Sequence, residues 1–275
     1  MTATRTAGRG ARRAANSTVL VGLTRMGFVG YGLLHLAIAW LAVQIALGHA
    51  ANTGDQSGAL RTLAAQPFGK FLLWLIAVGL CAMTLWQLLL AAVGHRDKQG
   101  RSRTMERVAS AARAVVYAAL AFTAVNVVTG APTSSANQQQ NATAGIMDKT
   151  AGQFLVGLAG LAVVAVGVGL IYYGAKRKFE DKLLIGRMNQ RTRQLARRLG
   201  QFGYVAKGVA FTIVGLLLLD AAITHNPAKS RGLDAALRAL AHQPFGMFLL
   251  IVVGVGFAAF GAYCFIQSRY RKVGS

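Results

Sequence analysis

The sequence predicts an all-α integral membrane protein in which six transmembrane helices form three parallel two-helix repeats. Three observations lead to this fold class. Apolar residues make up 54% of the 275 positions and charged residues only 14%, a balance too apolar for an ordinary soluble domain. Six apolar stretches are each long enough to cross a bilayer. Short motifs also recur at matching spacings, which indicates a tandem repeat.

The apolar stretches set the expected organisation of the chain. Each meets the requirement of about 20 helical residues for ~30 Å of hydrocarbon. The first is much longer than the core of a signal peptide, about 7–15 residues, so we expect a retained helix. The stretches run over residues 26–48, 68–93, 108–129, 152–174, 203–224 and 245–267. The expected parts are a basic cytoplasmic tail (1–25), repeat one (26–93), a basic cytoplasmic connection (94–107), repeat two (108–174), a second basic cytoplasmic connection (175–202), repeat three (203–267) and a cytoplasmic tail (268–275).

The distribution of Lys and Arg predicts the orientation. Of the 30 basic residues, 22 lie in the two tails and the two basic connections, and only six lie at the opposite ends of the helices. Short loops rich in Lys and Arg stay in the cytoplasm, so we expect a protein of the bacterial plasma membrane with both termini on the cytoplasmic side. The same charges would contact anionic headgroups.

A net charge of +22 also raises the possibility of a nucleic-acid binder. The densest basic segment, 176–198, carries a single aromatic residue, Phe179, and lacks the series of aromatic residues between charges on which single-strand binders stack bases. A nucleic-acid partner is therefore the weaker interpretation, and the bilayer, its headgroups or another membrane protein are the expected partners.

Self-similarity is the most specific signal. Gln66-Pro67-Phe68-Gly69 recurs as Gln243-Pro244-Phe245-Gly246, and more faintly as Gly152-Gln153-Phe154. The first helices align at offsets of 82 and then 94 residues, and the second helices at 83 and then 94. Each repeat crosses the membrane twice, so all three repeats start on the same side and have the same orientation. A pseudo-threefold bundle about an axis along the membrane normal is then the simplest closed arrangement. A row of hairpins is the open alternative. The predicted repeat helix starts are Pro67, Gly69, Phe71, Gly152, Phe154, Pro244, Gly246 and Phe248.

These motifs give the chain a resemblance to a known family. With the helix starts, the inner starts at Arg113-Ala114-Val115-Val116-Tyr117 and Ala206-Lys207-Gly208-Val209 make residues 20–268 similar to the domain-of-unknown-function 1206 membrane proteins common in actinobacteria. The resemblance implies three tandem two-helix units and no activity. The chain departs from the pattern at Tyr31, which stands where the other repeats carry Arg113 and Lys207.

Three polar residues share one repeat position inside apolar helices. Gln44, Asn126 and Asp220 each lie about one turn from the outer end, on a face of mostly small residues that begins at Gly30, Ala112 and Ala206. Small residues allow close helix packing, so we expect the triplet to face the bundle interior. The polar groups are either interhelical hydrogen-bonding partners or a selectivity ring for a small solute, proton or cation, with Asp220 as its titratable member.

Other polar residues have plainer interpretations. Arg113 and Lys207, just inside the inner boundary, are expected to extend toward headgroups. His35 occupies a slot that holds Tyr117 and Phe211 in the other repeats, so a packed neutral imidazole is expected.

No metal or cofactor site is predicted, because no ligand spacing or enzymatic signature is present. Cys81 and Cys264 are expected to be buried free thiols. The polar segment around Asn141 is expected to be a flexible loop, and the segments 60–63 and 237–240 are expected to form short amphipathic turns at the outer interface.

These observations favour a non-enzymatic protein that acts as a structural, lipid-interacting or partner-binding membrane component. The alternative is a small channel or transporter along the pseudo-symmetry axis. A conducting path needs polar groups along its length, and the shared helix face supplies only one polar layer.

Overall fold

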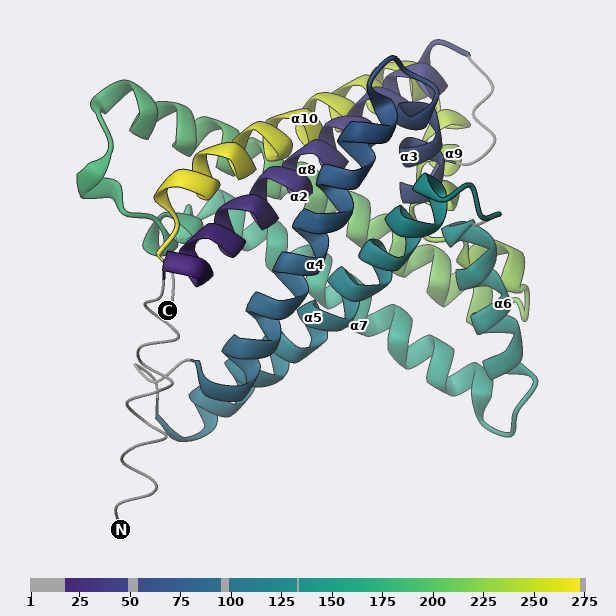
Figure 1. Cartoon of the computed structure of the whole chain (residues 1–275). Coiled ribbons are helices and arrows are strands. Elements are labelled where there is room, and N and C mark those ends of the chain that lie inside the picture. Colours follow the sequence, from purple (N-terminus) through teal and green to yellow (C-terminus); the bar gives the residue numbers. More distant parts are fainter. Residues whose placement is uncertain (1–17, 49–53, 95–98, 133, 273–275) are drawn as a thin grey trace.

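A computed structural model describes residues 18–48, 54–94, 99–132 and 134–272 (Figure 1). Six of its helices are long and apolar enough to cross a membrane, which agrees with the predicted fold class. They are α2 (Thr18–Ala46), α4 (Gly69–Val93), α5 (Gly100–Val128), α7 (Gly152–Ala175), α8 (Gln190–Ile223) and α10 (Gly246–Tyr270).

Shorter elements connect the long helices. The second helix of each repeat is preceded by a short helix, namely α3 (Gln56–Ala64), α6 (Ser135–Met147) and α9 (Leu233–Ala241). Three 3-10 turns complete the set: η1 (Lys178–Lys182), η2 (Ile185–Arg187) and η3 (Pro227–Ser230). Apart from an isolated bridge between Leu183 and Arg271, the described residues contain no β-structure.

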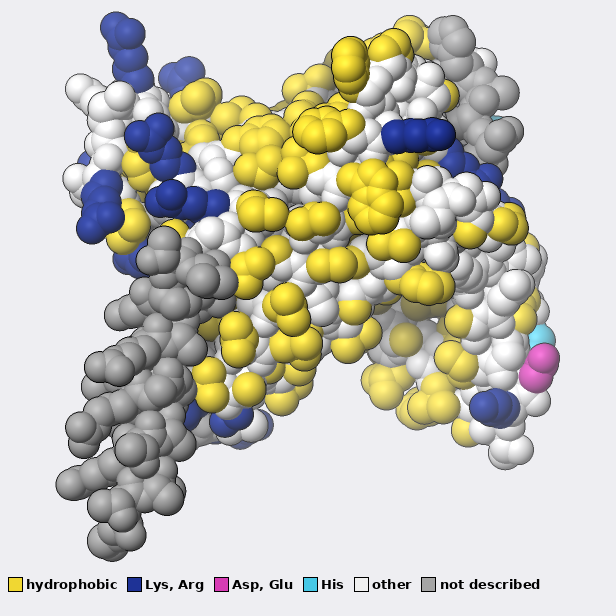
Figure 2. Space-filling model, in the orientation of Figure 1, with side chains coloured by type: hydrophobic (Ala, Val, Ile, Leu, Met, Phe, Trp, Pro, Cys, Tyr) yellow, Lys and Arg dark blue, Asp and Glu magenta, His cyan; other side chains and the backbone are white. Residues whose placement is uncertain are grey.

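The two ends of the bundle differ in content. α2 begins and α10 ends on the left of Figure 1, where the 176–189 segment also lies, and α3, α6 and α9 lie on the right. We call these the inner and the outer end. Figure 2 shows hydrophobic side chains covering the middle of the visible face, with Lys and Arg mainly toward its ends.

Contacts between the long helices follow a pseudo-threefold pattern. The second helix of each repeat packs closely against the first helix of the next, in the pairs α4 with α5, α7 with α8, and α10 with α2. Because the third pair joins repeat three back to repeat one, the repeats form a closed set rather than a row of hairpins. Within repeats one and three, α2 packs on α4 and α8 on α10, but α5 and α7 of repeat two hardly touch.

Equivalent small residues reveal this asymmetry. A Cβ added to Gly79 would lie 2.9 Å from the Cα of Gly30, and one added to Gly256 would lie 2.1 Å from the Cβ of Ala206. These contacts join the two helices of repeats one and three. The equivalent residues of repeat two, Ala112 and Ala162, are both exposed. The second repeat therefore has the small residues that this helix–helix contact needs, but its two helices, α5 and α7, do not pack together there.

The repeat helix starts share one backbone geometry. Phe68, Ala151 and Phe245 occupy equivalent positions and all adopt the left-handed conformation, with φ of 61°, 62° and 62°. The glycine that follows each one lies against a carbonyl oxygen of the preceding short helix. An added Cβ would lie 1.9 Å from that oxygen at Gly69, 1.7 Å at Gly152 and 2.3 Å at Gly246. Only glycine fits this turn, which accounts for its recurrence in the sequence.

The other residues of the predicted helix starts lie at the surface of the outer end. Pro67 and Pro244 are exposed, as are the aromatic rings of Phe71, Phe154 and Phe248.

Several sequence-based expectations need correction. The polar segment around Asn141 is the helix α6, capped by the Ser134 hydroxyl, and not a flexible loop. The helices also extend into the predicted connections, since α5 begins at Gly100 and α8 at Gln190. Of the two cysteines, Cys264 is buried as expected, but Cys81 is exposed.

The short segments around 60–63 and 237–240 are helical. They pack onto the end of the bundle through the buried side chains of Leu60 and Leu237.

Candidate functional site

A buried lysine lies where the three repeats meet. Lys207 on α8 is only 9% exposed, and its Nζ donates a hydrogen bond to the Tyr31 hydroxyl on α2 at 2.5 Å. The ring of Tyr31 also packs edge-on against Tyr117 of α5, with ring centroids 5.1 Å apart. Since α2, α5 and α8 are the equivalent first helices, these contacts place Lys207 near the pseudo-symmetry axis.

His35 supplies a second acceptor for Lys207. Its Nδ1 lies 2.8 Å from the carbonyl oxygen of Tyr31, an atom that only accepts hydrogen bonds. The proton is therefore assigned to Nδ1, which leaves Nε2 as an acceptor. Nε2 faces the Lys207 ammonium at 3.3 Å. The expectation of a neutral packed imidazole agrees with this geometry, and the ring contributes a hydrogen bond to the cluster besides packing.

Aromatic rings surround the rest of the ammonium. Lys207 Nζ lies 4.4 Å from the ring centroid of Phe260, 4.8 Å from that of Tyr31 and 5.9 Å from that of Phe211. No carboxylate forms a salt bridge with Lys207 in the part of the chain that the structure describes. Two acceptors and the electron-rich ring faces thus stabilise the buried charge.

The prediction that Lys207 extends to headgroups is wrong. Its side chain turns inward because Tyr31 and His35 offer acceptors next to the axis. Arg113, at the equivalent position of α5, keeps a side chain that is 47% exposed and lies 4.0 Å from Glu106. Its proposed headgroup contact remains a prediction.

The polar triplet does not form one cluster. Asp220 forms an ion pair with Lys229 of η3 at 2.7 Å, with its side chain 46% exposed. Gln44 and Asn126 are partly buried, and no hydrogen bond within the described ranges joins any two of the three residues. The expected convergence therefore fails for Asp220. On the helix face that carries the triplet, Gly30 and Ala206 contact the second helix of their own repeat and not the axis. The axis is lined instead by the adjacent helix face, which carries Tyr31 and Lys207.

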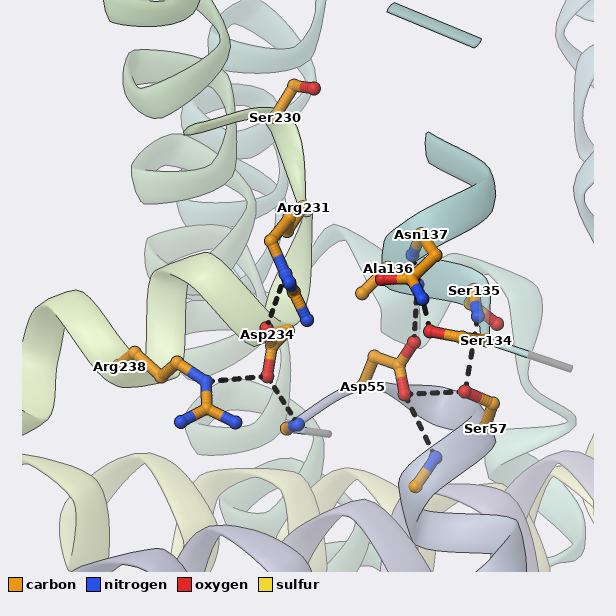
Figure 3. Close-up of polar contacts among 12 residues, drawn as sticks. Asp55, Ser57, Ser134, Ser135, Ala136, Asn137, Ser230, Arg231, Asp234 and Arg238 are labelled. Atoms are coloured by element: carbon orange, nitrogen blue, oxygen red, sulfur yellow. Dashed lines mark hydrogen bonds and ion pairs between the residues drawn. The ribbon is translucent and has the colours of Figure 1, made fainter. Parts of the chain in front are cut away.

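Two buried aspartates tie the outer end together (Figure 3). Asp55 accepts hydrogen bonds from the Ser57 hydroxyl and from the backbone N–H groups of Gly58 and Ala136, which connects α3 to α6. Asp234 binds Arg231 and Arg238, each at 2.9 Å, and the backbone N–H of Gly54, which connects α9 to the start of α3. Hydrogen bonds of these two aspartates therefore connect the short helices of all three repeats at the outer end.

Two arginines mark the inner end. Arg107 donates from Nε and Nη2 to the carbonyl oxygens of Ala91 and Ala92, both at 2.5 Å, and so caps the last turn of α4. Arg271, just past the end of α10, places its guanidinium over the rings of Phe28 and Trp86.

Comparison with known proteins assigns the chain to a family. A family model described as "Domain of Unknown Function (DUF1206)" matches residues 26–94, 108–177 and 202–271, which together make up more than half of the chain. The chain belongs to the DUF1206 family. Each match coincides with one two-helix repeat of the structure, so the DUF1206 unit is the helix pair.

One relative of this DUF1206 chain is "Uncharacterized protein YxxB" of Bacillus subtilis (strain 168). It is 29% identical over 251 residues, which cover 90% of each chain. The similarity therefore extends across all three repeats. No solved structure matches the chain.

The Lys207 cluster shows what sequence reasoning missed in this DUF1206 protein. The repeat alignment places Tyr31 with Lys207 and His35 with Phe211, but it does not show that these positions face the axis. The signal that could have found them is the coincidence of a basic group, a phenol and an imidazole on adjacent turns of equivalent helices. Among the described residues, no group of three or more His, Cys, Asp or Glu is placed to hold a metal ion.

Proposed function

We propose that this DUF1206 protein is a non-enzymatic, multi-pass component of the bacterial plasma membrane that holds lipid between α5 and α7. The observation that carries the proposal is the unclosed contact of repeat two. Gly30 meets Gly79 and Ala206 meets Gly256, whereas Ala112 and Ala162 are exposed. A face suited to close helix packing is thus left open to the bilayer.

An acyl chain suits this face in size and chemistry. The exposed side chains around it are apolar and include Val115 and Val116 on α5 and Leu158 on α7. Leaving such surfaces apart without filling the space forfeits dispersion contacts. Lipid chains are abundant in the bilayer and flexible enough to supply them. α7 is also the least buried of the six spans, so it offers the most surface for lipid.

A lipid role also agrees with the charge distribution. We propose that the inner end faces the cytoplasm, where its basic residues would contact anionic headgroups. Cysteines introduced at Lys149 and at Gln99 test this orientation. An impermeant thiol reagent added to intact cells should label the cysteine at position 149 and not the one at 99. The reverse pattern would contradict the orientation.

The channel alternative has weaker support. A conducting path on the pseudo-axis would pass the Lys207 ammonium, whose positive charge disfavours cations. The axis at this level is also filled by the rings of Tyr31, Phe260 and Tyr117. A closed outer end, fastened by Asp55 and Asp234, adds to the same conclusion.

Filling the open face tests the lipid proposal. In Ala112→Phe, the added ring occupies the space assigned to the acyl chain. Native mass spectrometry of the purified protein should then detect less co-purified phospholipid per chain than in the wild type. Ala118→Phe, which changes an exposed alanine on another face of α5, is the matched control and should retain lipid. Equal lipid retention in the two variants would refute the proposal.

A further inference from the structure

We propose that Arg271 and Trp86 form a binding site for a phosphoryl oxyanion at the inner end of the bundle, where α2, α4 and α10 meet. The oxyanion is carried either by a phospholipid headgroup or by free phosphate, which present the same acceptor oxygens. The site lies apart from the open face between α5 and α7 and does not depend on lipid being held there.

Two buried donors at this place have no acceptor. Trp86 is 1% exposed, yet its indole Nε1–H makes no hydrogen bond within the described residues. The buried Nε–H of Arg271 is likewise unpartnered there. A buried N–H that bonds to nothing is costly, and most such groups in proteins are satisfied. Both groups can only donate, so the missing partner is an acceptor.

The guanidinium of Arg271 lies over the rings of Trp86 and Phe28. The Cζ of Arg271 is 5.6 Å from the ring centroid of Trp86 and 5.5 Å from that of Phe28. Cation–π contacts with these rings stabilise part of the guanidinium charge. They do not satisfy Trp86, because an indole N–H lies in the plane of its ring and cannot bond to its own face.

The backbone holds Arg271 in place. Its N–H bonds to the carbonyl oxygen of Gln267. The N–H of Leu184 bonds to the carbonyl of Tyr270 at 2.8 Å, and the N–H of Lys272 bonds to that of Lys182 at 3.0 Å. Arg271 is therefore a fixed end of α10, fastened to the η1 and η2 segment, and its guanidinium is preorganised for a ligand.

The positive charge of Arg271 and its position at the end of α10 favour an oxyanion as the ligand. No carboxylate pairs with Arg271 in the described part of the chain, so its charge is free to attract an anion. Guanidinium groups match the geometry of phosphoryl oxygens, and bonds between charged partners are the stronger ones. The end of a membrane-spanning helix, with a tryptophan nearby, is also the level of headgroup phosphates.

Trp86 itself can report binding. The chain has three tryptophans, and Trp40 and Trp74 are exposed, so replacing those two by Phe leaves Trp86 as the sole tryptophan, which is excited selectively over the tyrosines. This protein is titrated in detergent with dihexanoyl phosphatidylglycerol, with inorganic phosphate, and with sodium chloride at matched ionic strength. A saturable change in Trp86 emission is expected with at least one phosphoryl ligand and not with chloride. Response to the lipid alone identifies a headgroup site, and response to phosphate as well identifies the free anion.

Variants separate the site from general attraction by a basic surface. Arg271→Gln should weaken binding at least tenfold, which corresponds to about 1.4 kcal/mol. Arg269→Gln removes an equal charge from an exposed position two residues away and should leave the affinity unchanged. If Arg271→Gln does not fold, Trp86→Phe removes the indole donor but keeps an aromatic ring, and its binding is followed by calorimetry with the same tenfold loss expected.

Two results would overturn the proposal. One is the absence of any saturable response to either phosphoryl ligand. The other is an equal loss of affinity in Arg271→Gln and Arg269→Gln, since that pattern belongs to a diffuse basic surface. Lipid retention at the Ala112 face is expected to be unchanged in Arg271→Gln, so the failure of this site and the failure of the proposed function are distinguishable.

Discussion

At the residue scale, Lys207 is the feature that most needs a physical account. An ammonium in the centre of an apolar bundle loses its hydration, and no carboxylate within the described residues compensates it. Its stabilisation comes from Tyr31, His35 and the ring of Phe260. The cluster also joins α8 to α2 and α10, so it contributes to holding repeats one and three together.

A double-mutant cycle tests the bond between Lys207 and Tyr31. Tyr31→Phe should lower the free energy of unfolding by roughly 1.5–3 kcal/mol, the usual contribution of a hydrogen bond to a charged group. In a Lys207→Met background the same change should cost close to nothing, because the donor is gone. The measurement is reversible unfolding in mixed micelles, with the exposed Tyr172→Phe as a control. Equal costs of Tyr31→Phe in both backgrounds would contradict the assigned bond.

At the element scale, the turn before each second helix is the most constrained local structure. The left-handed residue and the glycine after it recur in all three repeats, although the proline and glutamine of the sequence motif occur together in only two. Backbone geometry is therefore retained where the motif is faint. The glycine, at Gly69, Gly152 and Gly246, is the residue of the motif that all three repeats keep, because its missing Cβ leaves room for the carbonyl oxygen of the preceding short helix.

Alanine at this turn should destabilise the protein. Gly152→Ala places a Cβ 1.7 Å from the carbonyl oxygen of Ile146, so backbone must move, at a cost of roughly 1–3 kcal/mol or more. Gly145→Ala, in α6, should be neutral or slightly stabilising, because beyond its own stretch of helix no atom of the described residues lies within 4 Å of the new Cβ. Melting temperatures of the two variants in detergent provide the comparison. Similar melting temperatures would show that the turn relaxes freely.

The second prediction at this scale concerns the stability of an Asp55→Asn variant. Replacing it by Asn removes the charge from an acceptor that serves Ser57, Gly58 and Ala136. We expect a loss of roughly 1–3 kcal/mol in stability. The helix α6 (Ser135–Met147) should also become more sensitive to protease, because it loses a hydrogen bond that joins it to α3. Asp148→Asn changes an exposed carboxylate just past the end of this helix and should leave the protease sensitivity as it is.

At the scale of the whole molecule, the sequence predicts much of the fold. The six spans and the three repeats follow from hydropathy and from recurring motifs, because both depend on local residue choice. The sequence does not predict the helix α6, because its residues are polar and its helical state depends on the Ser134 cap and on Asp55.

The interior of the bundle was harder to predict. The sequence favours the face bearing Gln44, Asn126 and Asp220, because its polar positions match in every repeat, but the axis is lined by the face next to it. A repeat alignment fixes which positions are equivalent and not how each helix is rotated. That rotation follows from contacts such as Gly30 with Gly79 and Gly32 with Gly261, which join residues distant in sequence.

The three helix pairs form a closed set through contacts between successive repeats, whereas the contact within repeat two, between α5 and α7, is not formed. Disulfide formation in membranes tests this arrangement directly, with Cys81 and Cys264 replaced by Ala. The pair Gly157→Cys and Ala222→Cys spans α7 and α8, where the two Cβ atoms would lie 3.8 Å apart, close to the ~3.8 Å typical of disulfides. It should cross-link on mild oxidation. The pair Ala112→Cys and Ala162→Cys, across α5 and α7, should remain reduced. Cross-linking of both pairs to the same extent would contradict the open second repeat and the lipid role that rests on it.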